Sequence, residues 1–581
     1  CMSSGHIQHL ETDVLIIGAG GAGMSAAIAA SNEGRKTMLV DRSLIGRGGA
    51  TIMAQMTVAA ALGEQTPDDW RFHYADTLKA GRGLCSESLA RFLCENGVES
   101  IRLMDSGGTG WARKDGHMAQ TQAPGHDRPR CVYVDYLNTG PAVAKTLRTQ
   151  VAKHDDIARL GDILVVELLV KDGRVVGAVA LHLTTGDILV INAHAVIVAT
   201  GGLTRLYKRN SASLNMGGDG YALAARAGAE LLDMEFVQFF PIGHLAPRLV
   251  GFDPIMWDPF RYKLGGRLLN GLGEEFVEKY GHQGENKGYT VTRDAATYAI
   301  MKEVEAGRGS PAGGAYLSFE HVPEEKLREA FGPIIKKLAD NGIDLTKGPI
   351  EVAPIAHYHM GGVRVNVDMS TDVPGLFAAG EAVGGANGAN RLSGNAITEA
   401  ITFGLQAGRA ASAYAQSNAA LDRADIDALA EPVLSALQAA PNAGAKRPNV
   451  AALIARLQAT MQNHVGPFRT QEGLEQAQKE LAALRVEVDA LPLAGNGPQD
   501  PVQIDSLDLR NMLLVAEAVT QCALNRRESR GAHQREDFPA MDDAWVLNQV
   551  LAYRDGRWTV TQRPVERLPQ DQAEEVAVPA E

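Results

Sequence analysis

The sequence predicts an α/β protein in which a Rossmann-like nucleotide-binding domain is interrupted by an inserted domain and followed by a helical region. Three observations lead to this fold class. A buried strand at 14–17 runs through a glycine-rich turn into the small-residue segment MSAAIAA. Aromatic residues and prolines become frequent from about residue 232 to 356, after which the earlier composition returns. Beyond residue 410 the chain is alanine-rich, with apolar residues at helical spacing.

The bulk composition is that of an ordinary globular protein with several domains. A chain of 581 residues is too long for one hydrophobic core. The net charge of −13 argues against a nucleic-acid partner, because such proteins carry a basic face. No apolar run is long enough to span a membrane, and the first residues lack a secretion pattern, so we expect a cytoplasmic location.

The five cysteines are scattered along the chain and include no CxxC pair. We therefore expect neither disulfides nor an iron–sulfur or other metal site, but buried thiols in a reducing cytosol. If electrons leave this chain one at a time, another protein or a dissolved acceptor must receive them.

The glycine-rich turn has the spacing of a dinucleotide-binding motif. Gly18, Gly20 and Gly23 fit GxGxxG, in which the first glycine permits the turn and the second lets a pyrophosphate approach. The third lets helix and strand pack closely, and the helix dipole then faces the phosphates. A second strand, Thr37–Val40, ends at Asp41. A carboxylate at this position can accept hydrogen bonds from the ribose hydroxyls of a dinucleotide.

Other segments add to the same domain. The loop 43–63 is rich in small residues, such as Gly49, that permit close approach of a planar ring. Residues 163–181 form a predicted hairpin around the turn KDGR. The strand Val196–Thr200 runs into Gly201, which suits a second contact with a dinucleotide.

We predict domain boundaries from these changes in pattern. The first domain comprises 10–232 and 357–410, the inserted domain 233–356, the helical domain 411–567, and the tail 568–581 is expected to be disordered. Helices are predicted at Val291–Glu305, at Glu324–Leu338 and from about Ala396. Two helical stripes read as bundle core, namely Leu474, Ala477, Leu481, Leu484 and Val488, and Leu509, Met512, Leu513 and Ala516.

Four separated motifs together resemble the flavoprotein subunits of fumarate reductase and succinate dehydrogenase, whose superfamily includes L-aspartate oxidase. They are DVLIIGAGGAGMSAAI, VIVATGG with MGGDGYALAARAGA, MEFVQF, and HYHMGG with VPGLFAAGEAVGGANGANRLSGNAI. RRESRGAHQREDFPAMDD is similar to that family's C-terminal domain. The resemblance covers roughly residues 10–560. It implies an FAD-binding domain, a mobile capping domain and a helical C-terminal domain.

The resemblance also implies how FAD is held. Gly18, Gly20, Gly23 and Asp41 are expected at the adenosine and pyrophosphate half, and Asp219 at the nucleotide as well. Glu381 is expected at the ribityl chain and Gln55 near flavin N5. Ser393, Asn395 and Ala396 are expected to open a helix toward the pyrimidine edge, where its dipole stabilises negative charge on the reduced ring. The remaining predicted contacts are Gly49, Thr200 and Gly201.

The sequence departs from the family at the residue that tethers the flavin. In most membrane-bound relatives this residue is a histidine, and here the matching position is Ala50. No histidine lies in the whole segment 42–63. Because alanine has no nucleophilic nitrogen, the sequence predicts noncovalent FAD.

A second departure concerns the carboxylate clamp. The family pattern EFVQFHPTG places a histidine and a threonine where this chain has Phe240 and Ile242. Neither side chain donates a hydrogen bond, and a buried carboxylate without partners costs several kcal/mol. One of the two clamps for fumarate or succinate is therefore predicted to be missing, with His244 as a less favoured substitute.

A third departure concerns the proton donor, which in the family is an arginine before GEGG. Alignment on Gly265 places Tyr262 at that position, with Arg261 and Lys263 beside it. The alternative interpretation is a basic pair on the surface.

The other half of the predicted substrate site is retained. His357 and His359 lie in HYHMGG, and Arg391 lies in GANRLSGN. Arginine binds a carboxylate through two parallel hydrogen bonds. The alternative for either histidine is a structural role. The charged C-terminal group around Arg526 is expected to lock domain packing.

We therefore predict an FAD-dependent oxidoreductase that interconverts saturated and unsaturated C–C bonds next to a carboxylate, with an altered pocket. Its partners would be a small carboxylic acid and an iron–sulfur or other electron-transfer protein. Three alternatives stay open: an amino-acid oxidase similar to aspartate oxidase, the flavoprotein subunit of a reductase similar to adenylylsulfate reductase, and a non-catalytic flavin-loaded interaction subunit.

Overall fold

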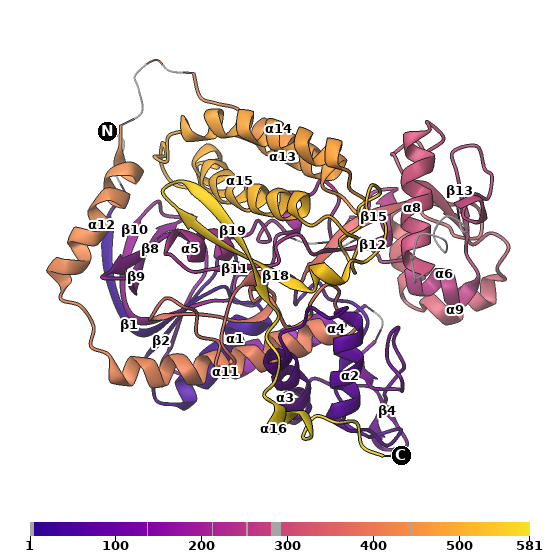
Figure 1. Cartoon of the computed structure of the whole chain (residues 1–581), viewed down its shortest axis with the longest axis horizontal. Coiled ribbons are helices and arrows are strands. Elements are labelled where there is room, and N and C mark those ends of the chain that lie inside the picture. The colour runs from indigo at the N-terminus through magenta and orange to yellow at the C-terminus, as the bar shows by residue number, and fades with distance from the viewer. Residues whose placement is uncertain are drawn as a thin grey trace.

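The first sheet and its helices form the part of the molecule shown in indigo to orange at the left of Figure 1. The computed structural model describes residues 5–580 except 136, 212, 251–253, 281–291, 441–443 and 445, and it describes no side chain at 262 or 292–294. Seven strands lie in the order β7-β2-β1-β10-β9-β8, with β17 also pairing β10. They are β1 (Ile7–Ile17), β2 (Thr37–Val40), β7 (Ile157–Leu160), β8 (Ile163–Lys171), β9 (Arg174–His182), β10 (Ile188–Val198) and β17 (Leu376–Ala378).

The parallel strands of this sheet bring their carboxyl ends to one edge. β1 pairs in parallel with both β2 and β10, and β17 pairs in parallel with β10. Val14 to Ile17 are almost fully buried, as expected for a central strand covered on both faces. The predicted strands at 14–17, 37–40 and 196–200 and the hairpin at 163–181 are confirmed, although β10 ends at Val198.

Two helices from distant parts of the chain pack across this sheet. α1 (Gly21–Asn32) crosses α11 (Asn395–Ser417) closely, because a side chain at Gly404 or Gly408 would reach within 2.4 Å of α1 backbone oxygens. This contact joins the first and second halves of the nucleotide-binding domain.

The inserted domain, called the cap below, projects at the right of Figure 1. Its strands are β12 (Val237–Ala246), β13 (Arg267–Leu269), β14 (Ala315–Ser318) and β15 (Ile350–His359), in the order β12-β15-β14-β13. Its helices are α6 (Asp258–Leu264), α8 (Thr292–Glu305), α9 (Glu324–Phe331) and α10 (Ile334–Asp340). A separate apolar core fills it, centred on Trp257, Phe260, Phe319 and Phe331.

The prediction of one continuous helix from Glu324 to Leu338 in the cap is wrong. The segment 324–338 forms two helices, because Gly332 has a φ of +49° and is followed by Pro333. A left-handed residue and a proline together end the first helix and begin the second.

The C-terminal helices are α12 (Arg423–Gln438), α13 (Val450–His464), α14 (Gln471–Asp489) and α15 (Pro501–Asn525). Both predicted stripes are buried in α14 and α15, which confirms the bundle core. α12 instead covers the first sheet, where Ile426, Ala430 and Leu434 pack with residues of β8 and β9.

The sequence analysis missed a small sheet in the C-terminal region. β18 (Leu547–Arg554) and β19 (Arg557–Pro564) form a hairpin that joins β11 (Leu231–Leu232) and β16 (Gly362–Val363). Its turn is Asp555-Gly556, both with positive φ, and Asp-Gly is a strong signal for a two-residue hairpin turn.

The prediction of a disordered tail is wrong for residues 568–580. They include α16 (Gln570–Ala573) and lie against α3 (Glu87–Ser106). The backbone N–H of Leu568 donates to Glu87, and Arg91 pairs with Glu575 at 2.8 Å.

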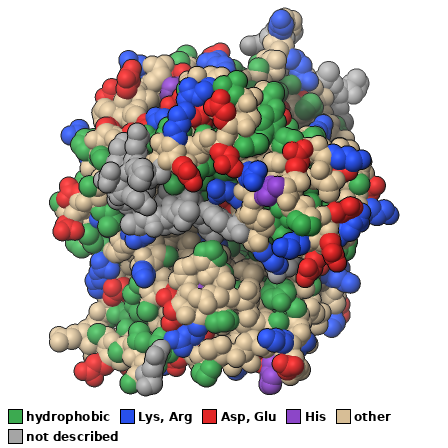
Figure 2. Space-filling view, turned by 90° about the vertical axis from the view of Figure 1, so that its right-hand side faces the viewer, with side chains coloured by type: hydrophobic (Ala, Val, Ile, Leu, Met, Phe, Trp, Pro, Cys, Tyr) green, Lys and Arg blue, Asp and Glu red, His purple; other side chains and the backbone are tan. Residues whose placement is uncertain are grey.

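The remaining elements are β3 (Val58–Ala59), β4 (Arg113–Lys114), β5 (His117–Met118), β6 (Cys131–Val132), α2 (Trp70–Ala80), α4 (Thr139–Ala152) and α5 (Asp219–Arg226). Three short 3-10 turns are at Thr204–Leu206, Gly380–Ala382 and Asp543–Trp545. Among the described residues, no helix has the length and apolar character needed to cross a membrane. On the face in Figure 2, positive and negative side chains are interspersed. The four described cysteines are free and buried, as predicted.

Candidate functional site

A cleft lies where the parallel strands of the first sheet end. Segments following β1, β2, β10 and β17 line it, together with the start of α11 and with Pro254, Met256, His357 and Tyr358 of the cap. The predicted site residues that line the cleft are Gly18, Gly20, Asp41, Gly49, Gln55, Thr200, Gly201, His357, Glu381 and Ala396. Ligands of open α/β sheets bind at this edge.

The glycines of the first turn have different roles. Gly18 has a φ of +105°, and a Cβ there would lie 2.2 Å from the Ala199 oxygen. A Cβ at Gly23 would lie 1.6 Å from the Gly18 oxygen, so Gly23 serves the packing of α1 on β1. Gly20 is different, because the nearest atom to its Cβ position is Thr51 Oγ1 at 3.7 Å. Gly20 therefore keeps space open on the cleft side.

The two predicted aspartates lie at the same end of the cleft. Asp41 accepts hydrogen bonds from the N–H of Ala19 at 2.7 Å and of Ser43 at 2.8 Å, which fix the carboxylate beside the turn. Asp219 lines an adjoining cavity of about 390 Å³ and accepts from Asn511 at 3.0 Å, with Arg42 at 3.5 Å. Asp219 is thus held by α5 and α15, and it lines the adjoining cavity together with Asp41.

The start of α11 faces the cleft through Ala396, Ile397 and Ala400. The side chain of Asn395 points away from the cleft, since it bonds to His73 and Thr77 of α2. Ser393 does not line the cleft, and its carbonyl accepts from His126 at 2.6 Å. The Ser393 carbonyl and the Asn395 side chain thus bond to partners within the protein, and the expected contacts of these two residues with a cofactor stay a prediction.

The lining residues fit a dinucleotide. A Gly-rich turn at a helix N-terminus is an anion-binding site, and the open position at Gly20 admits a pyrophosphate. Thr200 Oγ1 is buried without a hydrogen-bond partner among the described residues, as expected for a group that bonds to a ligand. The apolar surface of α11 suits a planar ring.

Two buried carboxyl groups lie on the α11 side of the cleft. Glu381 lines it and accepts from the N–H of His359 at 3.1 Å, and burial raises the pKa of Glu381 to about 7. Glu399, in α11, accepts from Asn387, and burial raises the pKa of its carboxyl group to about 8.

These raised pKa values predict how stability changes with pH. Because the folded protein keeps the Glu399 proton, this contribution is fully present below the unfolded-state pKa near 4.5 and is lost as pH rises through about 8. The substitution Glu399→Gln removes this titration. The free energy of unfolding of the variant should therefore increase relative to that of the wild type by a few kcal/mol between pH 5 and pH 9, since one pKa unit corresponds to roughly 1.4 kcal/mol. Thermal midpoints of the two apoproteins measure this. Equal pH dependence of both would contradict it.

At the cap end of the cleft, His357 is the central polar residue. Its Nδ1 lies 3.0 Å from Ser211 Oγ, and its ring contacts Phe240 edge-on with centroids 4.4 Å apart. Ile242, by contrast, is fully buried in the core of the cap, so the expectation that it faces the pocket is wrong. Phe240 lies against His357, and Pro254 and Met256 add apolar surface to the lining at this end.

His244 cannot replace the missing clamp residue. Its Nδ1 accepts from Trp257 at 3.1 Å and its Nε2 donates to the Pro247 oxygen. Burial lowers the pKa of His244, so the ring stays neutral with both nitrogens engaged inside the cap.

The structure does not bring His359 into the cleft. His359 is fully buried, with Nδ1 at 3.0 Å from the Tyr221 hydroxyl and Nε2 at 3.0 Å from the Met234 oxygen. Burial lowers the pKa of His359 to about 3. A register shift between Gln238 and Phe239 explains why two histidines two positions apart differ, because the bulge turns His357 out of the regular alternation.

Arg391 and Arg261 are not among the residues that line the cleft. The Arg391 guanidinium lies over the ring of Tyr358, 4.5 Å from its centroid, and Tyr358 lines the cleft. Arg261 is in α6 and is half-buried, whereas the side chain of Tyr262 lies outside the described residues. Gln55 lines the cleft, with its Nε2 3.4 Å from the Pro254 oxygen of the cap.

The sequence analysis missed Ser211, Asn215 and Tyr358, which also line the cleft. Tyr358 lies between the two histidines of HYHMGG, so its position in this motif could have indicated it. The C-terminal charged group has the predicted packing role, since Arg526 and Arg530 both donate to Glu528 inside the protein. Arg527 is exposed and takes no part.

Comparison with known proteins gives consistent matches. A family model described as FAD binding domain matches residues 13–397, and one described as fumarate reductase flavoprotein C-term matches 454–574. The chain is 35% identical to one subunit of the fumarate reductase (CoM/CoB) of Methanothermobacter marburgensis, over 93% of this chain and 97% of the relative. It is 31% identical to the succinate dehydrogenase flavoprotein subunit of Rickettsia bellii, over 96% of each.

Solved structures agree. Mycobacterium smegmatis Sdh1 in complex with UQ1 superposes with a TM-score of 0.86 at 31% identity, over 97% of this chain and 96% of that one. Adenylylsulfate reductase from Archaeoglobus fulgidus has a TM-score of 0.73 at 21% identity, over 97% and 98% of the two chains, which is a likeness of fold alone.

Proposed function

Since the chain belongs to the family of fumarate reductase and succinate dehydrogenase flavoprotein subunits, we propose that it reduces or forms a C–C double bond next to a carboxylate, with a pocket changed at Phe240. The family and its relatives make it an FAD-dependent oxidoreductase with the predicted α/β fold. The observation that carries the proposal is the cleft itself, where His357 and the cap meet the nucleotide-binding edge.

The residues proposed to hold FAD follow from the cleft. Gly18, Gly20 and Asp41 would hold the pyrophosphate and adenosine half, with Asp219 behind them. The other proposed contacts are Gly49, Gln55, Thr200, Gly201, Glu381 and Ala396, while Gly23, Ser393 and Asn395 would act by positioning the backbone. When bound, FAD supplies hydride transfer to or from a substrate carbon. Ala50 lines the cleft, and its methyl group supports noncovalent binding.

We assign the substrate carboxylate to His357 and Arg391. His357 would donate one hydrogen bond and polarise the carboxylate, which stabilises enolate-like charge at the reacting carbon. The Arg391 guanidinium lies against the ring of Tyr358, which lines the cleft, so a small movement of the guanidinium would add a second hydrogen bond to the carboxylate. Arg261 of the cap is the described residue proposed to carry the second proton.

The part of the substrate that lies beside Phe240 would be apolar, because the ring of Phe240 contacts His357 edge-on and donates no hydrogen bond. A carboxylate placed against this ring would lose its hydration without a new donor. Plain fumarate or succinate is therefore disfavoured relative to an acid with one carboxylate and one apolar end.

The substitution Phe240→His tests this pocket. The new imidazole supplies the missing donor, so kcat/KM for fumarate reduction should rise about tenfold or more, as expected for one new hydrogen bond to a charged group. Ile242→Thr is the control, because it places a hydroxyl in the apolar core of the cap and should lower the thermal midpoint without raising that activity. If Phe240→His leaves the preference among acids unchanged, Phe240 does not define the pocket.

We propose a redox protein or a dissolved acceptor as the electron partner. Among the described residues, no group of histidine, cysteine and acidic side chains could hold a metal ion. Two matched relatives are named as subunits, which supports a protein partner.

Anaerobic titration with saturated and unsaturated carboxylic acids tests the function. We expect one class of acid to bleach the oxidised flavin and the matching unsaturated acid to restore it. A bound flavin that responds to no acid would favour the non-catalytic alternative. Oxygen-dependent peroxide formation with an amino acid would favour the oxidase.

A further inference from the structure

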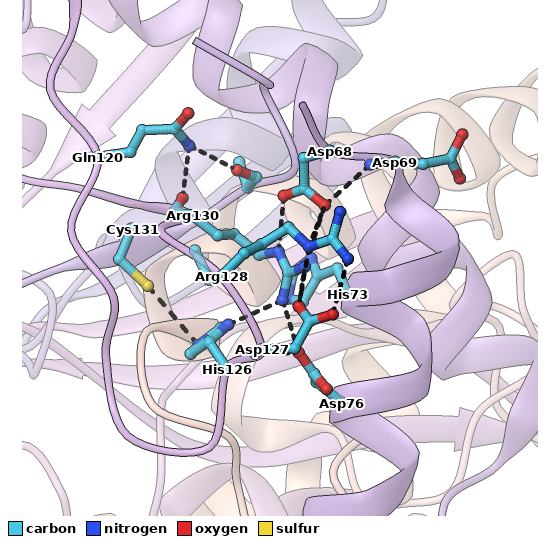
Figure 3. A network of polar contacts seen from close by, with 12 residues as sticks. Asp68, Asp69, His73, Asp76, Gln120, His126, Asp127, Arg128, Arg130 and Cys131 are labelled. Atoms are coloured by element: carbon cyan, nitrogen blue, oxygen red, sulfur yellow. Dashed lines mark hydrogen bonds and ion pairs between the residues drawn. The ribbon is translucent and has the colours of Figure 1, made fainter. Parts of the chain in front are cut away.

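A buried polar cluster around Arg130 (Figure 3) contacts the start of α11 through His126, which bonds to the carbonyl of Ser393. Arg130 is at its centre and is fully buried. Its guanidinium donates to Asp68 at 2.9 and 3.0 Å, to Asp76 at 2.8 Å and to Asp127 at 3.0 Å. The remaining contact is from Nη1 to His126 Nδ1 at 3.1 Å.

This last contact fixes the tautomer of His126. An arginine guanidinium donates hydrogen bonds and never accepts them, so His126 Nδ1 must be the acceptor. The ring is then neutral, with its proton on Nε2, and burial together with Arg130 lowers the pKa of His126 accordingly. Nε2–H donates to the carbonyl of Ser393 at 2.6 Å.

A second histidine holds the next residues of the same turn. His73 Nε2 lies 2.8 Å from Asn395 Oδ1, and Asn395 Nδ2 donates to Thr77 at 3.1 Å. His73 is fully buried, and burial lowers its pKa well below the usual range. Between the two contacts lies Gly394, with a φ of +89°, which begins α11 without a side-chain cap.

A gain in stability does not by itself explain this cluster of buried charges. Buried ion pairs rarely stabilise a fold more than apolar residues of the same volume, because desolvation offsets the attraction. Their best-supported benefit is a unique local arrangement. Here the element that is fixed is the turn 393–395, whose following residues line the cleft.

We infer that Arg130 and His126 are a positioning pair that aims the N-terminus of α11 into the cleft and thereby sets the reduction potential of the bound flavin. Arg130 keeps the Nε2–H tautomer of His126, and His126 holds the Ser393 carbonyl away from the cleft. The positive end of the α11 dipole then faces the ring and favours the reduced, negatively charged state. This inference rests on the proposed placing of the flavin against α11.

The substitution His126→Phe tests the pair, because it keeps a ring but removes the donor. The ratio of reduced to oxidised flavin at a fixed potential should fall about tenfold, equal to a midpoint about 30 mV lower. His126→Gln, whose amide can still donate to Ser393, should restore most of it. His117→Phe is the matched control, because His117 is exposed, pairs with Glu64 and lies outside the cluster.

If His126→Phe lowers the thermal unfolding midpoint but leaves the reduction potential of the flavin unchanged, the inference is overturned and His126 has only a structural role. If that variant does not fold, the ¹⁵N chemical shifts of the His126 ring in the wild type decide: protonated Nε2 supports the pair, and protonated Nδ1 overturns it. The potential is measured with redox dyes and needs no substrate. A failure of the proposed reaction is therefore distinguishable from a failure of this inference.

Discussion

The variant Gly20→Val should fold but lose FAD. Gly20 has a φ of −81°, which valine can adopt, and the space at its Cβ position is open toward the cleft. The added isopropyl group would occupy the space proposed for the pyrophosphate, so the turn amides could no longer reach it. We expect the dissociation constant for FAD to rise at least ~100-fold, or about 2.8 kcal/mol. Titration of the apoprotein, followed by flavin fluorescence, measures this.

Two other glycines serve as controls for this variant. Gly23→Ala should fail to fold, because its methyl group would overlap the Gly18 oxygen. Gly34→Ala lies on the surface with open space around it, and should cost only the strain of its positive φ, about 1 kcal/mol, with no effect on FAD. If Gly20→Val binds FAD as tightly as the wild type, the cofactor does not lie over this turn.

Replacement of His357 should reduce catalysis strongly without unfolding the protein. His357 lines the cleft on the cap side and can donate a hydrogen bond to a substrate carboxylate. Loss of one such donor typically reduces kcat by 10²–10³. We expect about this loss in kcat/KM for His357→Leu, which cannot donate a hydrogen bond, with the thermal midpoint and FAD content close to those of the wild type.

His359→Gln should show the opposite pattern, which makes the two histidines a matched pair. His359 bonds to Tyr221 and Met234 inside the protein, so its loss should cost about 1–3 kcal/mol of stability. The folded variant should retain most of its kcat/KM. Equal catalytic losses in both variants would contradict the distinction drawn from the bulge in β12 and β15.

Much of the fold follows from sequence patterns that have a direct physical cause. Strands buried on both faces are continuously apolar, as at 14–17, and helices covered on one side show stripes, as in α14 and α15. The turn glycines could be placed because their spacing reflects close backbone contacts. The small C-terminal sheet was missed although its turn, Asp555-Gly556, carried the signal.

The candidate site was less predictable, because side-chain direction there depends on tertiary detail. Strict alternation would put His357 and His359 on one face, and a bulge separates them. Ile242 could not be assigned to the core of the cap without knowing the path of β12. The bonds of the Ser393 carbonyl and the Asn395 side chain could not be foreseen, because His126 and His73 are more than 250 positions away in sequence.

We propose that the cleft binds an acid with a single carboxylate, held by His357, and with an apolar part against Phe240. The most direct test is the rate at which the photoreduced flavin of the wild type is reoxidised, without oxygen, by fumarate and by an unsaturated acid with one carboxylate and one methyl end. We predict that the monocarboxylic acid reacts at least about tenfold faster, equal to roughly 1.4 kcal/mol. Faster reoxidation by fumarate, with turnover near the ~10 s⁻¹ typical of enzymes, would contradict it.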